Sequence, residues 1–324
     1  MARTATTQNE EEMPLRISSL PQTRKSRLSS KAKENIGAYL FLLPWFAGVI
    51  FLTAGPMLSS LYLSFTKFDL LSPPQWIGLQ NYLGLLQDQR WLTAVRVTVV
   101  YVFLSVPLKL AFALALALLL NKSLKGLGIY RAVYYVPSLL GGSVSIAILW
   151  QQIFSGDGLV NKVLGLIGIH TSQSWISDPN TSLYTLIILA IWQFGSPMLI
   201  FLAGLKQIPT ELYEAAATDG SGKIRTFFQV TLPLLTPIVF FNMVLQMIGA
   251  FQAFTPAFIV SGGTGGPVDS TLIYTLYLYI EGFGNQLMGY ASAMAWLLLI
   301  AIAIFTGLAF LTSRYWVFYQ DERS

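Results

Sequence analysis

The stretch ELYEAAATDGSGKIRTFFQVTLPLLTP, residues 211–237, is a polar segment that leads from one long apolar stretch of the chain into another. Thr210, just ahead of it, is a candidate helix N-cap. Glu211 then falls in the first helical turn, where a carboxylate interacts favourably with the helix dipole. Asp219-Gly220 predicts the end of this helix, because glycine tolerates the left-handed conformation that ends helices. The stretch therefore predicts a short helix outside the apolar segments.

A second short helix is expected directly after the first. Ser221 is its candidate cap, it runs through Phe227-Phe228, and Leu232-Pro233 begins the next apolar span. A plain loop between two spans needs only a few residues, so this connection is longer than a linker requires.

One face of the first helix is acidic and narrow. Glu211, Glu214 and Thr218 share it at helical spacing, and the alanines at 215–217 keep the helix slim. Such a helix is suited to docking into a cleft of another protein. The alternative is an amphipathic helix on the inner leaflet, but those helices usually carry Lys or Arg opposite large apolar residues. The acidic, alanine-rich composition favours docking.

The composition is that of an integral membrane protein. Of the 324 residues, 54% are hydrophobic and only 11% are charged, whereas a soluble domain averages about 25% charged residues. The chain has no cysteine, which excludes disulfides, thiolate metal sites and a cysteine nucleophile. The single histidine, His170, cannot build a histidine metal cluster. The net charge of +5 is better explained by membrane orientation than by nucleic acid, and no nucleic-acid partner is expected.

Six segments have the roughly 20 mostly apolar residues that a membrane helix needs, which predicts an all-α fold with six transmembrane helices. The loop at 155–182 carries a short apolar run that suits the outer membrane surface, and the loop at 261–285 begins as a glycine-rich turn. The six segments are 36–66, 93–120, 132–154, 183–205, 233–260 and 286–312.

The distribution of basic residues predicts the orientation. Fifteen of the 20 Lys and Arg fall in residues 1–35, in the loops 121–131 and 206–232, and at the C-terminal end, all on one side. The positive-inside rule then places both termini and the 206–232 loop in the cytoplasm. Residues 1–35 are expected to be a disordered basic tail, 36–315 the membrane domain and 316–324 a second cytoplasmic tail.

The segment EAAATDG at 214–220, followed by FF, V and LP at 227–233, resembles the EAA signature of bacterial ABC importer permeases. Four more stretches, FLLPWFAGVIFLTAGPMLSSLYLSF, WIGLQNYLGLL, YRAVYYVPSLL and IWQFGSPMLIFLAGLKQIPTELYEAAA, resemble the carbohydrate-uptake, maltose-transporter type. GGTGGP near residue 265 fits the same subfamily. The resemblance covers roughly residues 36–315. It implies a multi-pass protein of the bacterial cytoplasmic membrane.

In that family the polar segment is the coupling helix, which sits in a groove of the cytoplasmic ATPase. On this resemblance Glu214 would face a basic residue of the ATPase, Gly220 would permit the turn, and Pro233 would fix the return to the membrane. The residues assigned to coupling are Glu211, Glu214, Ala215, Ala216, Asp219, Gly220 and Pro233.

The energy source is expected on a partner, because this chain has no P-loop. That motif needs G-x-x-x-x-G-K-[ST] to hold phosphates, and the nearest approach, Gly222-Lys223, is followed by Ile224 and has Ala217 at the first glycine position. The resemblance to ABC importer permeases implies two ATPase subunits that bind ATP and Mg²⁺, a second related permease and an extracytoplasmic solute-binding protein. No cofactor, metal or catalytic residue is expected on this chain, which is read as a transport subunit and not an enzyme.

A substrate path is expected along the fourth and fifth spans. Asn242, Gln246, Gly249 and Ala253 share one helical face, and amides both donate to and accept from sugar hydroxyls. The alternative is helix packing, since small and amide residues also hold membrane helices together. The maltose-type resemblance places sugar contacts in this region and near the tryptophan of the fourth span, which adds Gln193 and Gly195. Phe251 and Gln252 lie nearby and are weaker candidates.

Lys109 lies near the centre of the second span, where a charge costs about 2.5–3.5 kcal/mol and is normally paired, snorkelling or functional. It is assigned to the substrate path. A positive wall there would favour an acidic oligosaccharide such as alginate, and the alternative is a structural role. Arg96, nearer the outer interface, is expected to snorkel.

Three other functions stay open as alternatives. An importer of the same type for a non-sugar solute is the nearest of them. A secondary transporter driven by an ion gradient usually has carboxylates within its spans, and the six segments contain no Asp or Glu. A membrane-embedded enzyme would lack an acid–base pair here.

Overall fold

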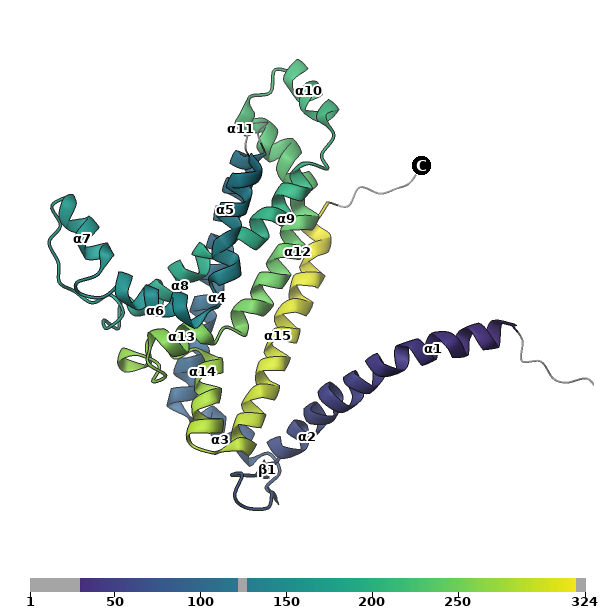
Figure 1. Ribbon diagram of the computed structural model, residues 1–324, viewed down its shortest axis with the longest axis vertical. Coiled ribbons are helices and arrows are strands. Elements are labelled where there is room, and N and C mark those ends of the chain that lie inside the picture. Colours follow the sequence, from purple (N-terminus) through teal and green to yellow (C-terminus); the bar gives the residue numbers. More distant parts are fainter. Residues whose placement is uncertain (1–29, 122–126, 319–324) are drawn as a thin grey trace, which may run out of the picture. The chain divides into compact units, whose positions relative to one another are not determined.

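The computed structural model describes residues 30–121 and 127–318, and nearly all of its regular structure is helical (Figure 1). Two compact units divide between Pro56 and Met57. The first contains α1 (Ser30–Gly48), the π-helix η1 (Val49–Ala54) and the start of α2 (Gly55–Ser64). α1 includes residues 30–35 of the predicted tail, and the candidate membrane span Ala38–Ser64 lies within the predicted span 36–66. The rest of the predicted N-terminal tail, and most of the predicted C-terminal tail at 316–324, lies outside the described residues.

Four helices in the described ranges are long and apolar enough to cross a membrane. One is the continuous stretch Ala38–Ser64, which joins part of α1 to η1 and α2. The other three belong to the second unit: α4 (Gln89–Leu120), α15 (Met288–Trp316) and a stretch made of α11 (Lys223–Thr226), the π-helix η2 (Phe227–Thr231) and α12 (Leu232–Phe251). Two bent helix pairs raise the number of candidate spans to six if each pair is one span.

The predicted third span, 132–154, is wrong as a single helix. It consists of α5 (Leu127–Leu140) and α6 (Val144–Ile153), which are bent by 97°. The bend falls at Gly141-Gly142, and Ser143 caps α6 by accepting a hydrogen bond from the Ile146 N–H. Two glycines followed by a capping serine end one helix and start another.

The predicted fourth span, 183–205, also contains a bend, of 42°, between α8 (Ser182–Trp192) and α9 (Gly195–Leu205). Pro197 has no N–H to donate to the Gln193 carbonyl one turn earlier. The Ser138 hydroxyl of α5 donates to that carbonyl instead, at 3.0 Å, and accepts from the Ser196 N–H at 2.9 Å. A side chain from a neighbouring helix thus satisfies the backbone of the break.

The predicted fifth span, 233–260, ends early. Its helix stops at Phe251, and 255–260 form the separate helix α13 (Thr255–Val260). Pro256 cannot continue the hydrogen-bond ladder to Gln252, which accounts for the break. α13 packs against α6, and the Gln151 amide of α6 donates to the Ile259 carbonyl at 2.7 Å.

The predicted glycine-rich turn at 261–285 contains more structure than expected: the 3-10 helix η3 (Pro267–Asp269), α14 (Tyr274–Tyr279) and the π-helix η4 (Ile280–Gly284). α14 is buried against α4 and α15. Its Tyr274 N–H donates to the Thr98 hydroxyl at 2.7 Å, and the Tyr274 hydroxyl donates to the Met294 carbonyl at 2.8 Å. A six-residue helix is too short for a periodic pattern to reveal.

The remaining elements are short. α3 (Gln80–Gln87) precedes α4, α7 (Leu159–Leu166) lies in the 155–182 loop, and α10 (Thr210–Thr218) is the predicted polar helix. The strands β1 (Thr66–Lys67) and β2 (Gln75–Trp76) pair antiparallel.

α4 is the central helix of the second unit, in contact with α8, α9, α12 and α14. Three of its alanines, Ala94, Ala113 and Ala117, are fully buried. α9 and α12 also approach closely, since a Cβ added at Gly204 would lie 2.1 Å from the Ile238 side chain. Small residues at helix contacts let backbones approach within a membrane, where packing supplies the attraction.

Candidate functional site

The polar helix α10 ends as the sequence predicts. Gly220 has φ +72°, the left-handed conformation. Its N–H donates to the Ala217 carbonyl at 3.0 Å, and the Ser221 N–H donates to the Ala216 carbonyl at 2.9 Å. This pair of bonds is a Schellman motif, which satisfies carbonyls that a helix end leaves free. The turn after α10 is therefore fixed by hydrogen bonds.

The cap of the following helix differs from the expectation. Gly222, not Ser221, is the N-cap of α11, and the Ser221 hydroxyl instead accepts from the Thr226 hydroxyl at 3.2 Å. Tyr213 attaches α10 to η2, since its hydroxyl accepts from the Thr231 hydroxyl at 3.3 Å. We call residues 210–226, from α10 through α11, the polar hairpin.

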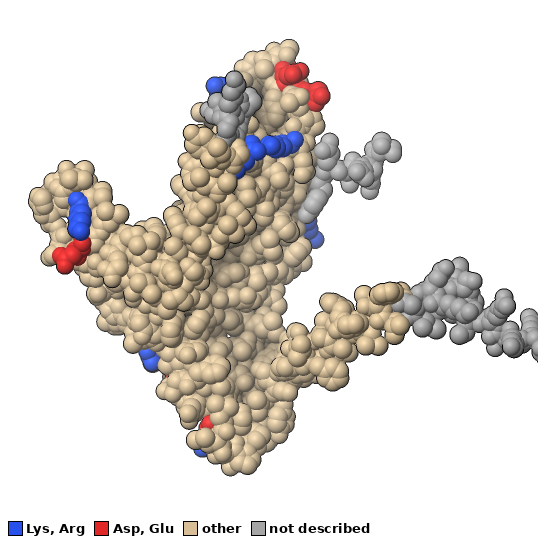
Figure 2. All heavy atoms as spheres, viewed as in Figure 1, with Lys and Arg blue, Asp and Glu red and all other residues tan. Residues whose placement is uncertain are grey.

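The exposed face of the polar hairpin carries its charge. Glu211 and Glu214 are exposed, as are Ala215 and Asp219, while Ala216 is half-buried. Figure 2 shows acidic side chains gathered over α10 with basic ones beside them, while the other charged side chains on this face lie apart from one another, for example over α7. Between α10 and α11–η2 lies a hollow of about 290 Å³, lined by Leu212, Ala215, Ala216, Asp219, Ser221, Arg225, Gln229 and Val230.

The polar hairpin is joined to α12 without a break. Lys223–Phe251 is one helix of 29 residues, roughly 43 Å long at about 1.5 Å per residue. Pro233 lies in the first turn of α12, and the helix continues back from it to Lys223. Just ahead of it the helix widens into the π-turn η2, in which the Leu232 N–H donates to the Phe227 carbonyl five residues back. A wider turn accommodates a proline that has no N–H to donate.

A polar cavity of about 320 Å³ lies where three helix breaks meet. Gly142 lies between α5 and α6, Gln193 between α8 and α9, and Gln252 between α12 and α13. Broken helices free backbone polar groups within a membrane-spanning bundle, which is tolerated where they line a cavity. The lining residues are Tyr101, Ser105, Val106, Lys109, Gly142, Ala190, Gln193, Gln246, Gly249, Ala250, Gln252, Ala253, Phe254, Thr255 and Pro256.

Six of the eight residues assigned to the substrate path line this cavity: Lys109, Gln193, Gln246, Gly249, Gln252 and Ala253. The other two lie elsewhere. Asn242 is fully buried, and neither polar atom of its amide has a partner among the described residues. Gly195 packs against α5, where an added Cβ would lie 2.7 Å from the Tyr134 carbonyl oxygen. The structure therefore places Gly195 at a helix contact.

Most polar side chains of the cavity have hydrogen-bonding groups to spare. Gln193 donates to the Gly141 carbonyl at 3.0 Å, and its amide oxygen accepts no bond from a described residue. The side chains of Gln246 and Gln252 make no hydrogen bond to described residues. Tyr101 and Ser105 of α4 were missed by the sequence reasoning, although Tyr101, Ser105 and Lys109 follow one another at intervals of four residues and so share one helix face.

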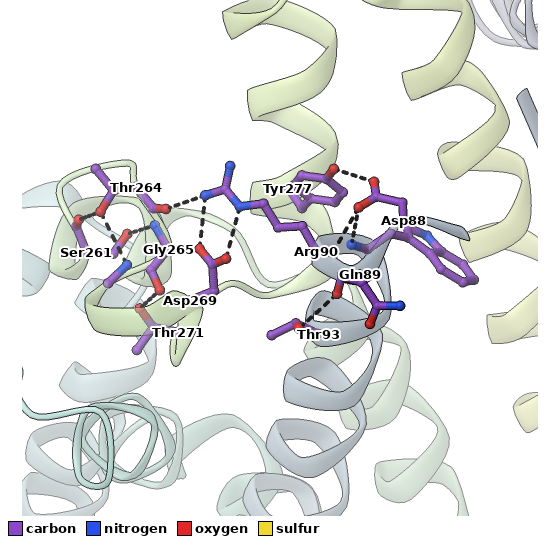
Figure 3. A network of polar contacts seen from close by, with 12 residues as sticks. Asp88, Gln89, Arg90, Thr93, Ser261, Thr264, Gly265, Asp269, Thr271 and Tyr277 are labelled. Carbon is purple, nitrogen blue, oxygen red and sulfur yellow. Dashed lines mark hydrogen bonds and ion pairs between the residues drawn. The ribbon is translucent and has the colours of Figure 1, made fainter. Parts of the chain in front are cut away.

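A second polar cluster fixes the N-terminal end of α4 (Figure 3). The Arg90 guanidinium donates from Nε and Nη2 to both carboxylate oxygens of Asp269, at 3.0 Å each, and from Nη2 to the Thr264 carbonyl at 3.0 Å. A bidentate pair fixes geometry as well as charge. It holds the loop after α13 against α4.

Asp88 caps α4 beside this pair, with its carboxylate accepting from the N–H groups of Arg90 and Trp91. The hydroxyls of Tyr277 and Tyr290 donate to the same carboxylate, at 2.5 and 2.8 Å. Burial alone would raise the pKa of Asp88, but these four hydrogen bonds outweigh it and hold the pKa below the ordinary 3.8. Asp88 thus joins α4, α14 and α15 as an ionised group.

The sequence of this chain is similar to those of known transport proteins. The family described as "Binding-protein-dependent transport system inner membrane component" matches residues 80–318. The probable ABC transporter permease protein YesP of Bacillus subtilis (strain 168) is 49% identical over 300 residues, covering 92% of this chain and 96% of YesP. The lactose transport system permease protein LacF of Rhizobium radiobacter is 32% identical over 294 residues, covering 89% and 98%.

Among solved structures, a chain from a bacterial alginate ABC transporter, crystallised in complex with its alginate pentasaccharide-bound periplasmic protein, superposes with a TM-score of 0.76. It is 21% identical in sequence, and the match covers 88% of this chain and 96% of that chain. The two chains share a fold.

Proposed function

The chain belongs to the family of binding-protein-dependent transport system inner membrane components, and from this membership we propose that it moves a sugar through the polar cavity under the control of its polar hairpin. It is a multi-pass inner membrane protein and the permease subunit of an ABC transporter. It is a transport component and not an enzyme. The sugar substrate is proposed because LacF is a lactose permease.

One observation supports the mechanism most directly: a single helix joins the polar hairpin to the cavity. Lys223 lies in α11 of the hairpin, and Gln246 and Gly249, near the other end of the same helix, line the cavity. A displacement of the hairpin therefore moves the cavity wall, since a continuous helix transmits motion as a rigid element. α10 of the polar hairpin is the coupling helix, and the ATPase acts on the permease by displacing it.

The coupling residues keep the roles that the family resemblance gives them. Glu211 and Glu214 present charge to a basic groove of the ATPase, and Ala215, Ala216 and Asp219 lie beside the hollow next to α10. Gly220 supplies the left-handed turn. Pro233 acts through the widened turn that precedes it, within an unbroken helix.

The substrate path is assigned to the cavity-lining residues Lys109, Gln193, Gln246, Gly249, Gln252 and Ala253. Their amides, with the hydroxyls of Tyr101 and Ser105, supply both donors and acceptors for sugar hydroxyls. Asn242 is not part of this lining, and its buried amide lies about one helical turn from Gln246.

The topology that follows has six membrane crossings, each bent helix pair counting as one, with both termini and the polar hairpin in the cytoplasm. The proposed partners are two ATPase subunits, which bind ATP and Mg²⁺, a second related permease, an extracytoplasmic solute-binding protein and membrane lipid. The chain itself holds no cofactor in this scheme.

The absence of cysteine from the chain allows a direct test of the coupling role. A single cysteine at Ala216, in α10, should crosslink to the ATPase in the assembled transporter. The matched control is a cysteine at Asp157, an exposed residue of the 155–182 loop, and it should not crosslink to the ATPase. Crosslinking of Ala216→Cys to lipid alone would refute the coupling role.

Charge reversal tests the same contact by function. Glu214→Lys should lower sugar uptake and sugar-stimulated ATP hydrolysis while the protein remains inserted in the membrane. The basic groove of the ATPase would then face a positively charged lysine and repel it. Asp157→Lys is the control for charge reversal at an exposed carboxylate and should leave both rates unchanged. Equal rates in both variants would contradict the docking of α10.

A further inference from the structure

Lys109 is the one charged residue among those that line the polar cavity. It makes no hydrogen bond or ion pair with any residue in the described ranges, and no Asp or Glu is among the lining residues. Arg90 on the same helix is different, since Asp269 neutralises it at 3.0 Å. The cavity therefore carries a positive charge that its own walls do not balance.

The neutral polar groups around Lys109 lie on both sides of the cavity. Tyr101 and Ser105 share its face of α4, and Gln246 and Gln252 come from the far end of α12 and the break after it. Hydroxyl and amide groups suit a hydroxyl-rich ligand. A site with several such groups and one ammonium is complementary to a sugar that also bears one negative charge.

We propose that the cavity selects sugars that carry a carboxylate, that is, oligosaccharides containing uronic acid, and that Lys109 is the residue that determines this specificity. This inference rests on the proposed function as a sugar importer. Lys109 is half-buried, and attraction between a partly buried ammonium and a carboxylate is screened less than between exposed charges. A neutral sugar of the same shape leaves the ammonium without a counter-charge.

The single lysine favours a carboxylate over a phosphate. Phosphate groups carry more charge and are commonly held by bidentate arginine or by several charged donors. No arginine lines the cavity, and Lys109 presents one point charge. One ammonium balances one carboxylate.

The test compares each uronate with its own methyl ester, which removes the charge and keeps the sugar skeleton. The complete transporter, with its binding protein, is reconstituted in vesicles, and uptake of a panel of uronate disaccharides and their methyl esters is measured. The parent protein should take up at least one acid at least tenfold faster than its ester. Lys109→Met should slow uptake of that acid at least tenfold and bring the ratio of acid to ester uptake close to one.

Two further variants separate charge from structure. Lys109→Arg keeps the charge and should keep the preference for the acid. Arg96→Met removes an exposed cation of α4 that does not line the cavity, and the ratio of acid to ester uptake should not change. The binding protein is the same in every sample, so a change in this ratio belongs to the permease.

The inference is overturned if Lys109→Met slows acid and ester equally, or if the parent prefers neutral sugars and the variant does not change that preference. It is also overturned if a sugar phosphate, and no uronate, depends on Lys109. The proposed function fails separately: in that case no sugar, charged or neutral, would stimulate ATP hydrolysis by the parent transporter.

Discussion

Replacing Gly220 with alanine isolates the backbone turn that ends α10. Gly220 has φ +72°, and an added Cβ would meet no atom within 4 Å. The substitution therefore causes no clash with the rest of the protein. The cost comes from the left-handed backbone alone, about 1–2 kcal/mol for a residue with a Cβ. That free energy raises the population of the opened turn by a factor of roughly 5 to 30.

Hydrogen exchange measures this opening directly. The Ser221 N–H donates to the Ala216 carbonyl at 2.9 Å only while the turn is closed, so its protection should fall by about the same factor of 5 to 30. Substrate-stimulated ATP hydrolysis should fall in the same variant, because a loosened hairpin transmits less motion to α12. Gly220→Asn should be milder in both assays, since asparagine tolerates the left-handed conformation.

Gly222 provides the matched control two residues later. It has φ −71°, an ordinary conformation for any residue, and an added Cβ there also meets no atom within 4 Å. Gly222→Ala should leave exchange and ATP hydrolysis near the parent values. Equal protection of the Ser221 amide in Gly220→Ala and Gly222→Ala would refute the argument that the left-handed turn holds the hairpin closed.

Three further predictions concern the membrane part of the chain. Asn242→Leu should raise thermal stability in detergent, by about 1–3 kcal/mol, because it removes a buried amide without partners in the described residues; an unchanged or lower melting temperature would contradict this. Gly195→Ala should cost about 1–3 kcal/mol through its contact with α5, while Gly249→Ala, which meets no atom within 4 Å, should keep the melting temperature and alter uptake. The Asp88 carboxylate, whose pKa is lowered, should stabilise the parent relative to Asp88→Asn by a constant amount from pH 7 to pH 5; the difference in melting temperature should shrink as the pH falls below 3.8 and through the folded-state pKa.

The sequence predicted the parts of this protein that depend on local signals. Long apolar segments indicate membrane helices whatever their partners are. The end of α10 was predictable because the left-handed turn needs only Gly220 and its neighbours, and the Schellman bonds join residues at most five apart. The EAA pattern from Glu214 to Gly220 is equally local, so the order of residues is enough to indicate the family.

The breaks in the helices were less predictable, although each has a cause that is visible in the sequence. Proline or paired glycine lies at each break, but membrane helices also tolerate proline without breaking, as the continuous helix through Pro233 shows. Whether a helix breaks at such a residue depends on whether a neighbouring side chain satisfies the backbone groups that the break leaves without helical partners. At Gln193 that neighbour is Ser138, 55 residues earlier in the chain.

The amide stripe of α12 shows the same limit. Helical spacing puts Asn242 and Gln246 on one face, yet Gln246 lines the cavity and Asn242 is fully buried. Helical spacing assigns residues to one face along the whole of a helix. The elements that pack against that face differ from one turn to the next, because neighbouring helices end at different points. The cavity exists only beside the last turns of α12, because three chain breaks converge there.

The order of residues was therefore enough to indicate the membrane class, the polar hairpin and the residue types available for binding a sugar. Which of those residues lie together depends on the packing of the helices. Arg90 and Asp269 are 179 positions apart, and Lys109 meets Gln193 and Gln246 around one cavity, because contacts between distant segments depend on how the helices pack and where they break. The spacing of residues along one helix does not indicate how the helices pack or where they break.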